Sequence, residues 1–382
     1  MQTPDPVALV AALSAAGSRV VIVSTGGGAR AIAQLVTTPG ASAVVLDGLV
    51  PYAREAVDVV LGGSQESYCS PRTARRLAMK AWQRCVDYGA PPAQAIGAAV
   101  VASLRTRTPK RGAHRVITAV QTLATTATAC LELEKDARRR DDEEDVAAAL
   151  MLSQLAAAAA PRLPQADLAG LRPGERVEAE ICMAPPEWRR LMEGSARAVC
   201  IAAGQTTGSE PAPSAADRLL FPGSFDPLHD GHRTMARIAE EIAERPVEYE
   251  LSVANVEKPL LDYHEITSRV AQFADRSLWL TRAATFLEKI VLFPQGTFVR
   301  LADPRYYGGS AEAAAAAVRT IAAQAKGLIV FGRVRDGTFT DPAKLDVPQP
   351  LRDISYFVSQ REFRMDVSST ALRKEHLACD AP

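Results

Sequence analysis

Short apolar runs alternate with helical patterns over about the first 155 residues of the chain. A β-branched run at 20–23 leads into the glycine-rich segment 24–28, and a helical pattern follows at 29–35. Similar patterns predict strands at 43–46, 48–50 and 116–120, and helices at 73–87 and 146–159. This alternation predicts an α/β layer with a mainly parallel or mixed sheet.

The α/β alternation resumes at residue 218, after a stretch of different composition. Prolines punctuate 161–213, where the pattern predicts strands at 177–182 and 198–202 and a linker at 204–216. Beyond it we predict strands at 219–221, 249–254 and 327–331, and helices at 232–244 and 265–273. The chain is therefore expected to form two α/β domains, residues 1–160 and 217–377, joined by an extension and linker at 161–216.

The composition is that of a globular protein without a charged macromolecular partner. Hydrophobic residues make up 47% and charged residues 23%, and 44 basic residues balance 44 acidic ones, so no nucleic-acid partner is expected. No apolar run approaches a membrane span and no secretory signal opens the chain, which predicts a cytoplasmic protein with no membrane partner. The six cysteines lack metal-site spacing, so no metal site is predicted. The mixed charge run 134–145 is interpreted as a solvated loop and helix start.

A dense motif follows the strand predicted at 219–221. It reads Gly223-Ser224-Phe225-Asp226-Pro227-Leu228-His229-Asp230-Gly231-His232. Its turn brings main-chain N–H groups to the carboxyl end of the sheet, where the next helix points its N-terminus, and both features favour phosphate groups. His229 and His232 open that helix together, and Gly231 between them lets the backbone approach closely. No third ligand has a place beside them, so we interpret the pair as a phosphate site and not a metal site.

A second helix start lies far downstream at 367–373. Ser and Thr are favoured N-caps, so Ser368, Ser369 and Thr370 predict a helix N-terminus with free N–H groups. Arg373 then falls in the first turn, where a guanidinium is suited to clamp a phosphate.

Together these two segments resemble the nucleotidylyltransferase superfamily, which includes the nicotinamide- and nicotinate-mononucleotide adenylyltransferases, phosphopantetheine adenylyltransferase and the cytidylyltransferases. The patterns Gly-x-Phe-Asp-Pro-x-His-x-Gly-His and Ser-Ser-Thr-x-x-Arg match in full and in order, across about 160 residues. The resemblance implies a Rossmann-like nucleotidyltransferase fold. It also implies in-line attack of a phosphate-bearing acceptor on the α-phosphate of a nucleoside triphosphate, with release of pyrophosphate.

The resemblance also assigns roles to individual residues. It makes His229, His232 and Arg373 catalytic, and Mg²⁺ is expected to accompany ATP as the substrate. The expected nucleotide-binding residues are Gly223, Ser224, Phe225, Asp226, Gly231, Lys258, Ser368, Ser369 and Thr370. The chain departs from the pyridine-nucleotide adenylyltransferases after a middle strand, where their Gly-x-Asp segment is shortened and Asp303 is the candidate substitute. That departure leaves the acceptor open.

The N-terminal half resembles the C-terminal domain of the CinA family, which includes nicotinamide-mononucleotide amidases. The residues that carry the likeness are those at 24–28, 39–43 and 52–56. It implies a CinA-like α/β domain with a pocket at Ser24, Thr25, Gly27, Gly28 and Tyr52. Val23 and Val57 replace the acid and the lysine of the family pattern. Because a serine nucleophile needs a base, we predict a domain that keeps the fold without efficient amidase chemistry.

The pairing of the two domains points to pyridine-nucleotide metabolism. Our first hypothesis is a nucleotidyltransferase that transfers AMP from ATP to nicotinamide or nicotinate mononucleotide. Another acceptor such as phosphopantetheine, CTP as the donor, and a nucleotide-binding sensor or scaffold without turnover stay open. CinA-type domains self-associate, which favours a homodimer.

Overall fold

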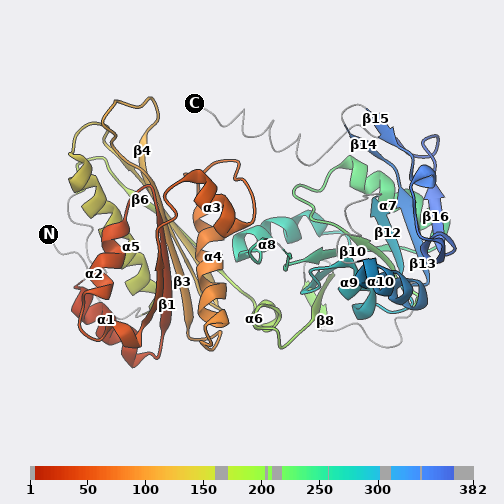
Figure 1. Cartoon of the computed structure of the whole chain (residues 1–382), viewed down its shortest axis with the longest axis horizontal. Helices are drawn as coiled ribbons and strands as arrows, with labels where there is room; N and C mark the ends of the chain where they lie inside the picture. The colour runs from red at the N-terminus through yellow and green to blue at the C-terminus, as the bar shows by residue number, and fades with distance from the viewer. Residues whose placement is uncertain are drawn as a thin grey trace. The chain divides into compact units, whose positions relative to one another are not determined.

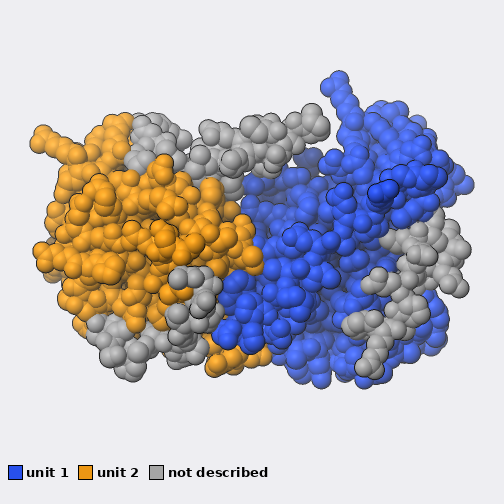
Figure 2. Space-filling view, turned by 180° about the vertical axis from the view of Figure 1, so that it is seen from behind, with its two compact units in different colours: residues 1–189, 257–265 blue, residues 190–256, 266–382 orange. Residues whose placement is uncertain are grey.

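The computed structural model describes residues 5–159, 171–202, 205–208, 217–256, 258–301, 311–335 and 338–364. Its contacts divide the chain into two compact units (Figures 1 and 2). Unit 1 comprises Met1–Arg189 with Glu257–Glu265, and unit 2 comprises Arg190–Val256 with Ile266–Pro382. Compact units need not coincide with domains, so the domain boundaries expected from the sequence stay predictions.

Unit 1 is built on a six-stranded sheet of order β2-β1-β3-β4-β5-β6. β1 runs parallel to β2 and β3, whereas β3 to β6 form an antiparallel meander. Its strands are β1 Arg19–Thr25, β2 Val45–Leu49, β3 Ala95–Ser103, β4 His114–Gln121, β5 Thr125–Leu133 and β6 Val177–Met183. Its helices are α1 Pro6–Ala15, α2 Ala29–Val36, the 3-10 turn η1 Ala41–Ala43, α3 Arg54–Leu61, α4 Pro71–Asp87 and α5 Arg140–Ala159, and α6 Pro186–Glu193 crosses into unit 2.

Helices cover both faces of this sheet. α1, α2 and α5 lie on one face and α3 and α4 on the other (Figure 1). On the first face, Leu13, Ile22 and Leu150 are fully buried in one continuous apolar core. The carboxyl ends of the parallel strands β1 and β2 lead into the segments that line the candidate pocket.

Unit 2 is built on an eight-stranded sheet of order β16-β13-β12-β9-β10-β11-β7-β8. The six strands from β16 to β11 are parallel, and β7 and β8 extend them antiparallel. Its strands are β7 Ala198–Ala202, β8 Gln205–Gly208, β9 Leu219–Pro222, β10 Val247–Ser252, β11 Leu278–Thr281, β12 Thr297–Leu301, β13 Gly327–Phe331 and β16 Ser355–Val358, with a separate hairpin of β14 Arg333–Arg335 and β15 Thr338–Thr340. Its helices are α7 Asp230–Ala243, α8 Tyr263–Val270, η3 Ala271–Phe273, α9 Phe286–Leu292, α10 Ala311–Gln324, η5 Pro342–Lys344 and α11 Gln349–Arg352, of which α8 begins in unit 1.

The strand order of unit 2 creates a topological switch point. After β9 the chain builds β10 and β11 on one side, and it then returns to build β12, β13 and β16 on the other side of β9. Alternate side chains of β9 lie on opposite faces of the sheet. Leu220 packs in the core with α9 and α10, whereas Phe221 contacts Tyr249. In open α/β sheets, ligands bind in the crevice at the carboxyl ends of the strands at such a point.

The mixed α/β fold expected from the sequence is confirmed, and several expected elements match closely. The strands at 198–202 and 327–331 match β7 and β13 residue for residue, and the helix expected at 73–87 is α4. The two strands expected at 43–46 and 48–50 form a single strand, β2 Val45–Leu49, and η1 occupies Ala41–Ala43 before it. The linker at 204–216 is wrong at 205–208, where β8 pairs with β7. The solvated interpretation of 134–145 fails for Glu143 and Glu144, which are buried.

Among the described helices, none combines the length and the apolar character needed to cross a membrane.

Candidate functional site

Unit 1 carries a hollow of about 340 Å³ at the carboxyl end of β1. It is lined by Ser24, Gly26, Gly27, Ala29, Val50, Tyr52, Arg140, Asp141 and Glu144. Three of the residues expected from the sequence therefore line it, and Thr25 and Gly28 are their chain neighbours. Gly26 is required there, because its φ is +73° and a Cβ would lie 2.0 Å from the Ala102 carbonyl oxygen.

A carboxylate from α5 occupies the N-terminus of α2 beside this hollow. Glu144 accepts hydrogen bonds from the N–H groups of Gly28 at 2.9 Å and Arg30 at 3.1 Å. Arg140 lies 3.1 Å from the same carboxylate and also donates to the Gly26 carbonyl. Burial opposes ionisation, but these donors outweigh it and hold the pKa of Glu144 below its ordinary value. Neither Arg140 nor Glu144 was predicted as a pocket residue, because the charge run in the sequence indicates no partner for either side chain.

Ser24 is held by its own loop. Its side chain is buried, and its Oγ donates to the Gly27 carbonyl oxygen at 2.9 Å. No hydrogen bond described for Ser24 comes from a base, and Val57 is an apolar buried residue of α3. The serine hydroxyl thus ties the turn together in this structure.

Unit 2 presents the motif 223–229 as a turn, here named the donor turn, between β9 and α7. The Gly223 N–H donates to the Glu250 carbonyl at 2.9 Å, which continues the pairing of β9 with β10. A Cβ at Gly223 would lie 2.5 Å from the ring of Phe225, which is fully buried. Phe225 itself has a φ of +44°, so the turn is both tightly packed and conformationally unusual.

The donor turn is braced from the end of α8. The Gln272 amide donates to the Phe225 carbonyl at 3.1 Å and accepts from the Leu228 N–H at 2.7 Å. Arg269 lies 3.2 Å from the Asp226 carboxylate. Neither Arg269 nor Gln272 was singled out from the sequence, because their partners lie more than 40 residues earlier in the chain.

His229 and His232 form a stacked pair at the first turn of α7. Their ring centroids are 3.8 Å apart with an interplanar angle of 27°. Nδ1 of His232 accepts the N–H of His229 at 3.3 Å, so this nitrogen is unprotonated and the ring proton is assigned to Nε2. The His229 Nδ1 is buried without a hydrogen-bond partner among the described residues.

Burial keeps both imidazoles neutral. It lowers the pKa of His232 to about 3, with a smaller contribution from His229. It also lowers the pKa of His229, against the opposing charge of Asp230. At neutral pH the pair therefore offers hydrogen-bond donors, and not cations, beside the N–H groups that open α7.

The remaining expected residues fall in different places. Ser224 is exposed on the donor turn, and Gly231 is buried in α7. Lys258 is exposed in the segment that packs with unit 1. Asp303, Ser368, Ser369, Thr370 and Arg373 lie outside the described residues. Within the described ranges, no group of three or more His, Cys, Asp or Glu side chains is placed to hold a metal ion.

Residues 220–375 match the cytidylyltransferase-like family model, over a range that includes the donor turn and the paired histidines. This stretch is a cytidylyltransferase-like domain. Comparison with curated proteins gives no significant match.

Solved structures similar to the N-terminal part of the chain are CinA superfamily proteins. One from Escherichia coli is 19% identical, covers 40% of this chain and 87% of its own, and has a TM-score of 0.34. A competence/damage-inducible protein from Agrobacterium tumefaciens is 20% identical, covers 41% and 98%, and has a TM-score of 0.33. A third, from Enterobacter cloacae, is 17% identical, covers 42% and 95%, and has a TM-score of 0.35.

The cytidylyltransferase-like domain thus carries the general features of a nucleotidyltransferase. Its donor turn lies after β9, the central strand at the switch point, and its paired histidines open the helix that follows. Phosphate oxygens are favoured where a helix N-terminus and preorganised N–H donors converge.

Proposed function

We propose that the protein transfers a nucleotidyl group, AMP from Mg²⁺-bound ATP, to nicotinamide or nicotinate mononucleotide. An oxygen of the acceptor phosphate attacks the α-phosphorus, and the bond between this phosphorus and the bridging oxygen of the β-phosphate breaks. Pyrophosphate leaves with the electron pair of that bond. The chain's own residues need only position the phosphates and donate hydrogen bonds where charge develops.

The observation that carries this proposal is the stacked, neutral pair His229 and His232 at the start of α7. A neutral imidazole whose Nδ1 already accepts a main-chain N–H must present its other nitrogen as a donor. Because the rings stack on each other and the His229 N–H holds the His232 ring, the donors are oriented before the triphosphate arrives and need little reorganisation. The predicted helix start at Ser368–Thr370, with Arg373, would supply the opposite side of the phosphate site.

The choice of acceptor in this proposal is based on the sequence of the N-terminal half. The resemblance of 24–28 and 52–56 to nicotinamide-mononucleotide amidases favours a pyridine mononucleotide over phosphopantetheine. A panel containing both kinds of acceptor, each offered with ATP and with CTP, separates these alternatives.

Pyrophosphate release by the full chain tests the activity. We expect release with ATP, Mg²⁺ and a pyridine mononucleotide, and a loss on the order of a hundredfold in His232→Asn. Arg237→Ala is the matched control, since Arg237 lies on the same helix and pairs only with exposed Glu241 among its described ion pairs. Absence of release with every acceptor, while ATP still raises the melting temperature, would refute the enzyme and favour a nucleotide-binding sensor.

A second function, ligand binding without hydrolysis, is favoured for the hollow of unit 1. The buried bond from Ser24 to Gly27 leaves the hydroxyl without a base. We expect no ammonia release from nicotinamide mononucleotide in either wild type or Ser24→Ala. Release that disappears in Ser24→Ala would overturn this interpretation.

A further inference from the structure

A short piece of the cytidylyltransferase-like domain is built into unit 1. Residues 258–265 lie between β10 and the first turn of α8, within the family match, yet they cluster with the N-terminal unit. Several of their side chains are buried there, with Asp262 1% and Tyr263 0% exposed. The segment is therefore a structural part of unit 1 and not a loose loop.

Main-chain and side-chain hydrogen bonds fix this segment against the sheet. The Tyr263 N–H donates to the Thr126 hydroxyl at 3.1 Å, and the Tyr263 hydroxyl donates to the Leu123 carbonyl at 2.6 Å. Leu260 donates its N–H to the Gln83 side chain at 3.2 Å. These contacts hold the start of α8 at several independent points.

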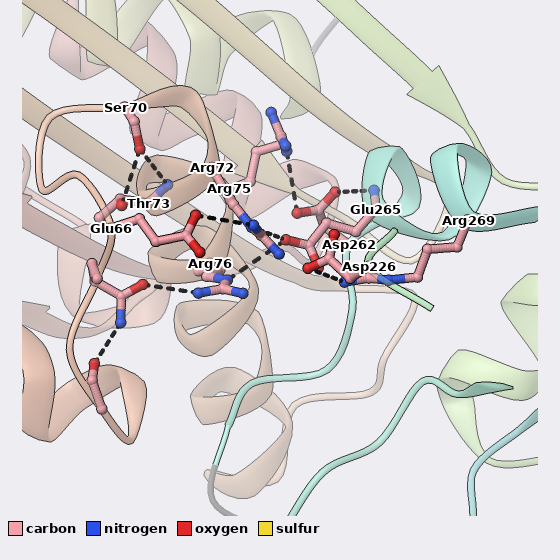
Figure 3. A network of polar contacts seen from close by, with 12 residues as sticks. Glu66, Ser70, Arg72, Thr73, Arg75, Arg76, Asp226, Asp262, Glu265 and Arg269 are labelled. Carbon is pink, nitrogen blue, oxygen red and sulfur yellow. Dashed lines mark hydrogen bonds and ion pairs between the residues drawn. The ribbon is translucent and has the colours of Figure 1, made fainter. Parts of the chain in front are cut away.

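Three arginines of α4, here named the arginine clamp, hold the acidic residues of the segment (Figure 3). Arg75 lies 3.2 Å from Asp262, Arg72 lies 2.7 Å from Glu265, and Arg76 lies 3.6 Å from the same Glu265. Burial raises the pKa of Asp262, with Arg75 opposing that shift. Removing Arg75 would leave a buried carboxylate without its cation, which destabilises this end of the helix strongly.

The other end of the same helix serves the donor turn. α8 runs from Tyr263 to Val270 and continues into η3, so the clamped residues and the bracing residues belong to one continuous helical segment. Arg269 beside Asp226 is visible in the same view (Figure 3). Gln272 then holds the Phe225 carbonyl and the Leu228 N–H.

We propose that the arginine clamp is a positioning device for the donor turn. By fixing the first turn of α8 it fixes the helix whose far end holds the donor turn through Arg269 and Gln272. The N-terminal unit thereby contributes to nucleotide binding without any chemistry of its own. This inference rests on the proposed binding of a nucleoside triphosphate at the donor turn.

Two measurements on the full chain test it. In Arg75→Ala we expect the Kd for Mg²⁺-bound ATP to rise on the order of tenfold, and Arg75→Lys to restore part of the affinity. We also expect faster hydrogen exchange at the Leu228 amide, which is the proton that Gln272 accepts. The matched control is Arg84→Ala, because Arg84 lies on the same helix but pairs with Asp47 at 2.5 Å.

The outcomes separate this inference from the proposed function. Equal ATP affinity and equal Leu228 exchange in the Arg75 and Arg84 variants would overturn the clamp. If wild type binds no nucleoside triphosphate, the proposed function fails, while the exchange measurement still decides whether the clamp controls the turn. Should Arg75→Ala fail to fold, Glu265→Gln weakens the clamp with little change in side-chain size, and the same two readouts apply.

Discussion

The partly buried histidine pair should make the stability of unit 2 depend on pH in a defined direction. Burial lowers the pKa of His232 from 6.5 to about 3. In the unfolded chain the His232 side chain therefore becomes protonated near pH 6.5. In the folded chain it becomes protonated only near pH 3. Inside this window, stability falls as the pH falls, by about 1.4 kcal/mol for each pH unit. From about pH 7.5 to about pH 4.5, His232 alone should cost about 3 kcal/mol.

The substitution His232→Asn isolates this contribution. The asparagine amide oxygen can still accept the His229 N–H, but the amide does not titrate in this pH interval. Native-state hydrogen exchange in peptides covering β9 and α7 should show wild type losing about 3 kcal/mol more than the variant over the same pH interval. NMR titration of the imidazole, assigned by its absence in the variant, should show a neutral ring at pH values well below 6.

Two results would refute this reasoning. One is an imidazole of His232 that titrates near its ordinary pKa in the nucleotide-free protein. The other is an equal loss of stability in wild type and variant, which would mean that the acid sensitivity comes from carboxylates elsewhere. Either result would also remove the argument that the pair binds phosphate as neutral donors.

Two further substitutions test the two loops. Gly223→Ala places a methyl group 2.5 Å from the buried ring of Phe225, so we expect a lower melting temperature, a loss of about 1–3 kcal/mol and weaker ATP binding. Glu144→Gln weakens the acceptor of the Gly28 and Arg30 N–H groups and should cost about 1–3 kcal/mol at neutral pH. Because the pKa of Glu144 is lowered, that contribution is present above about pH 4.5 and is lost in stronger acid, where denaturation curves of wild type and variant should converge.

The parts of the fold that could be predicted from the sequence are those with local causes. The apolar periodicity of α4 and the β-branched run of β13 depend on neighbours in the chain, and both were placed well. β3 and β5 were not predicted, because their small residues, alanines and threonines, form no distinct apolar alternation. Burial of Glu143 and Glu144 depends on partners more than 25 residues away, such as His114 at 2.6 Å and Gly28 at 2.9 Å.

The candidate site shows the same division. The motif placed the donor turn and the histidine pair correctly at the start of α7, since the glycine, the strand and the helix start are adjacent in the chain. The bracing by Gln272 could not be predicted, because a glutamine after an amphipathic helix has many equally acceptable solvent-facing roles. Residues 258–265 belong to unit 1 through tertiary contacts alone, so their placement could not be predicted either.

Neutral histidines divide the proposed chemistry into two separable parts. A nucleoside triphosphate brings several negative charges, and hydrogen-bond donors without charge can orient these oxygens but cannot neutralise them. Neutralisation must then come from cations, which in the proposed function are Mg²⁺ and the predicted contacts Arg373 and Lys258. Loss of a cation weakens binding of substrate and transition state alike and should raise KM. Loss of His232 removes a donor aimed at developing charge and should instead lower kcat.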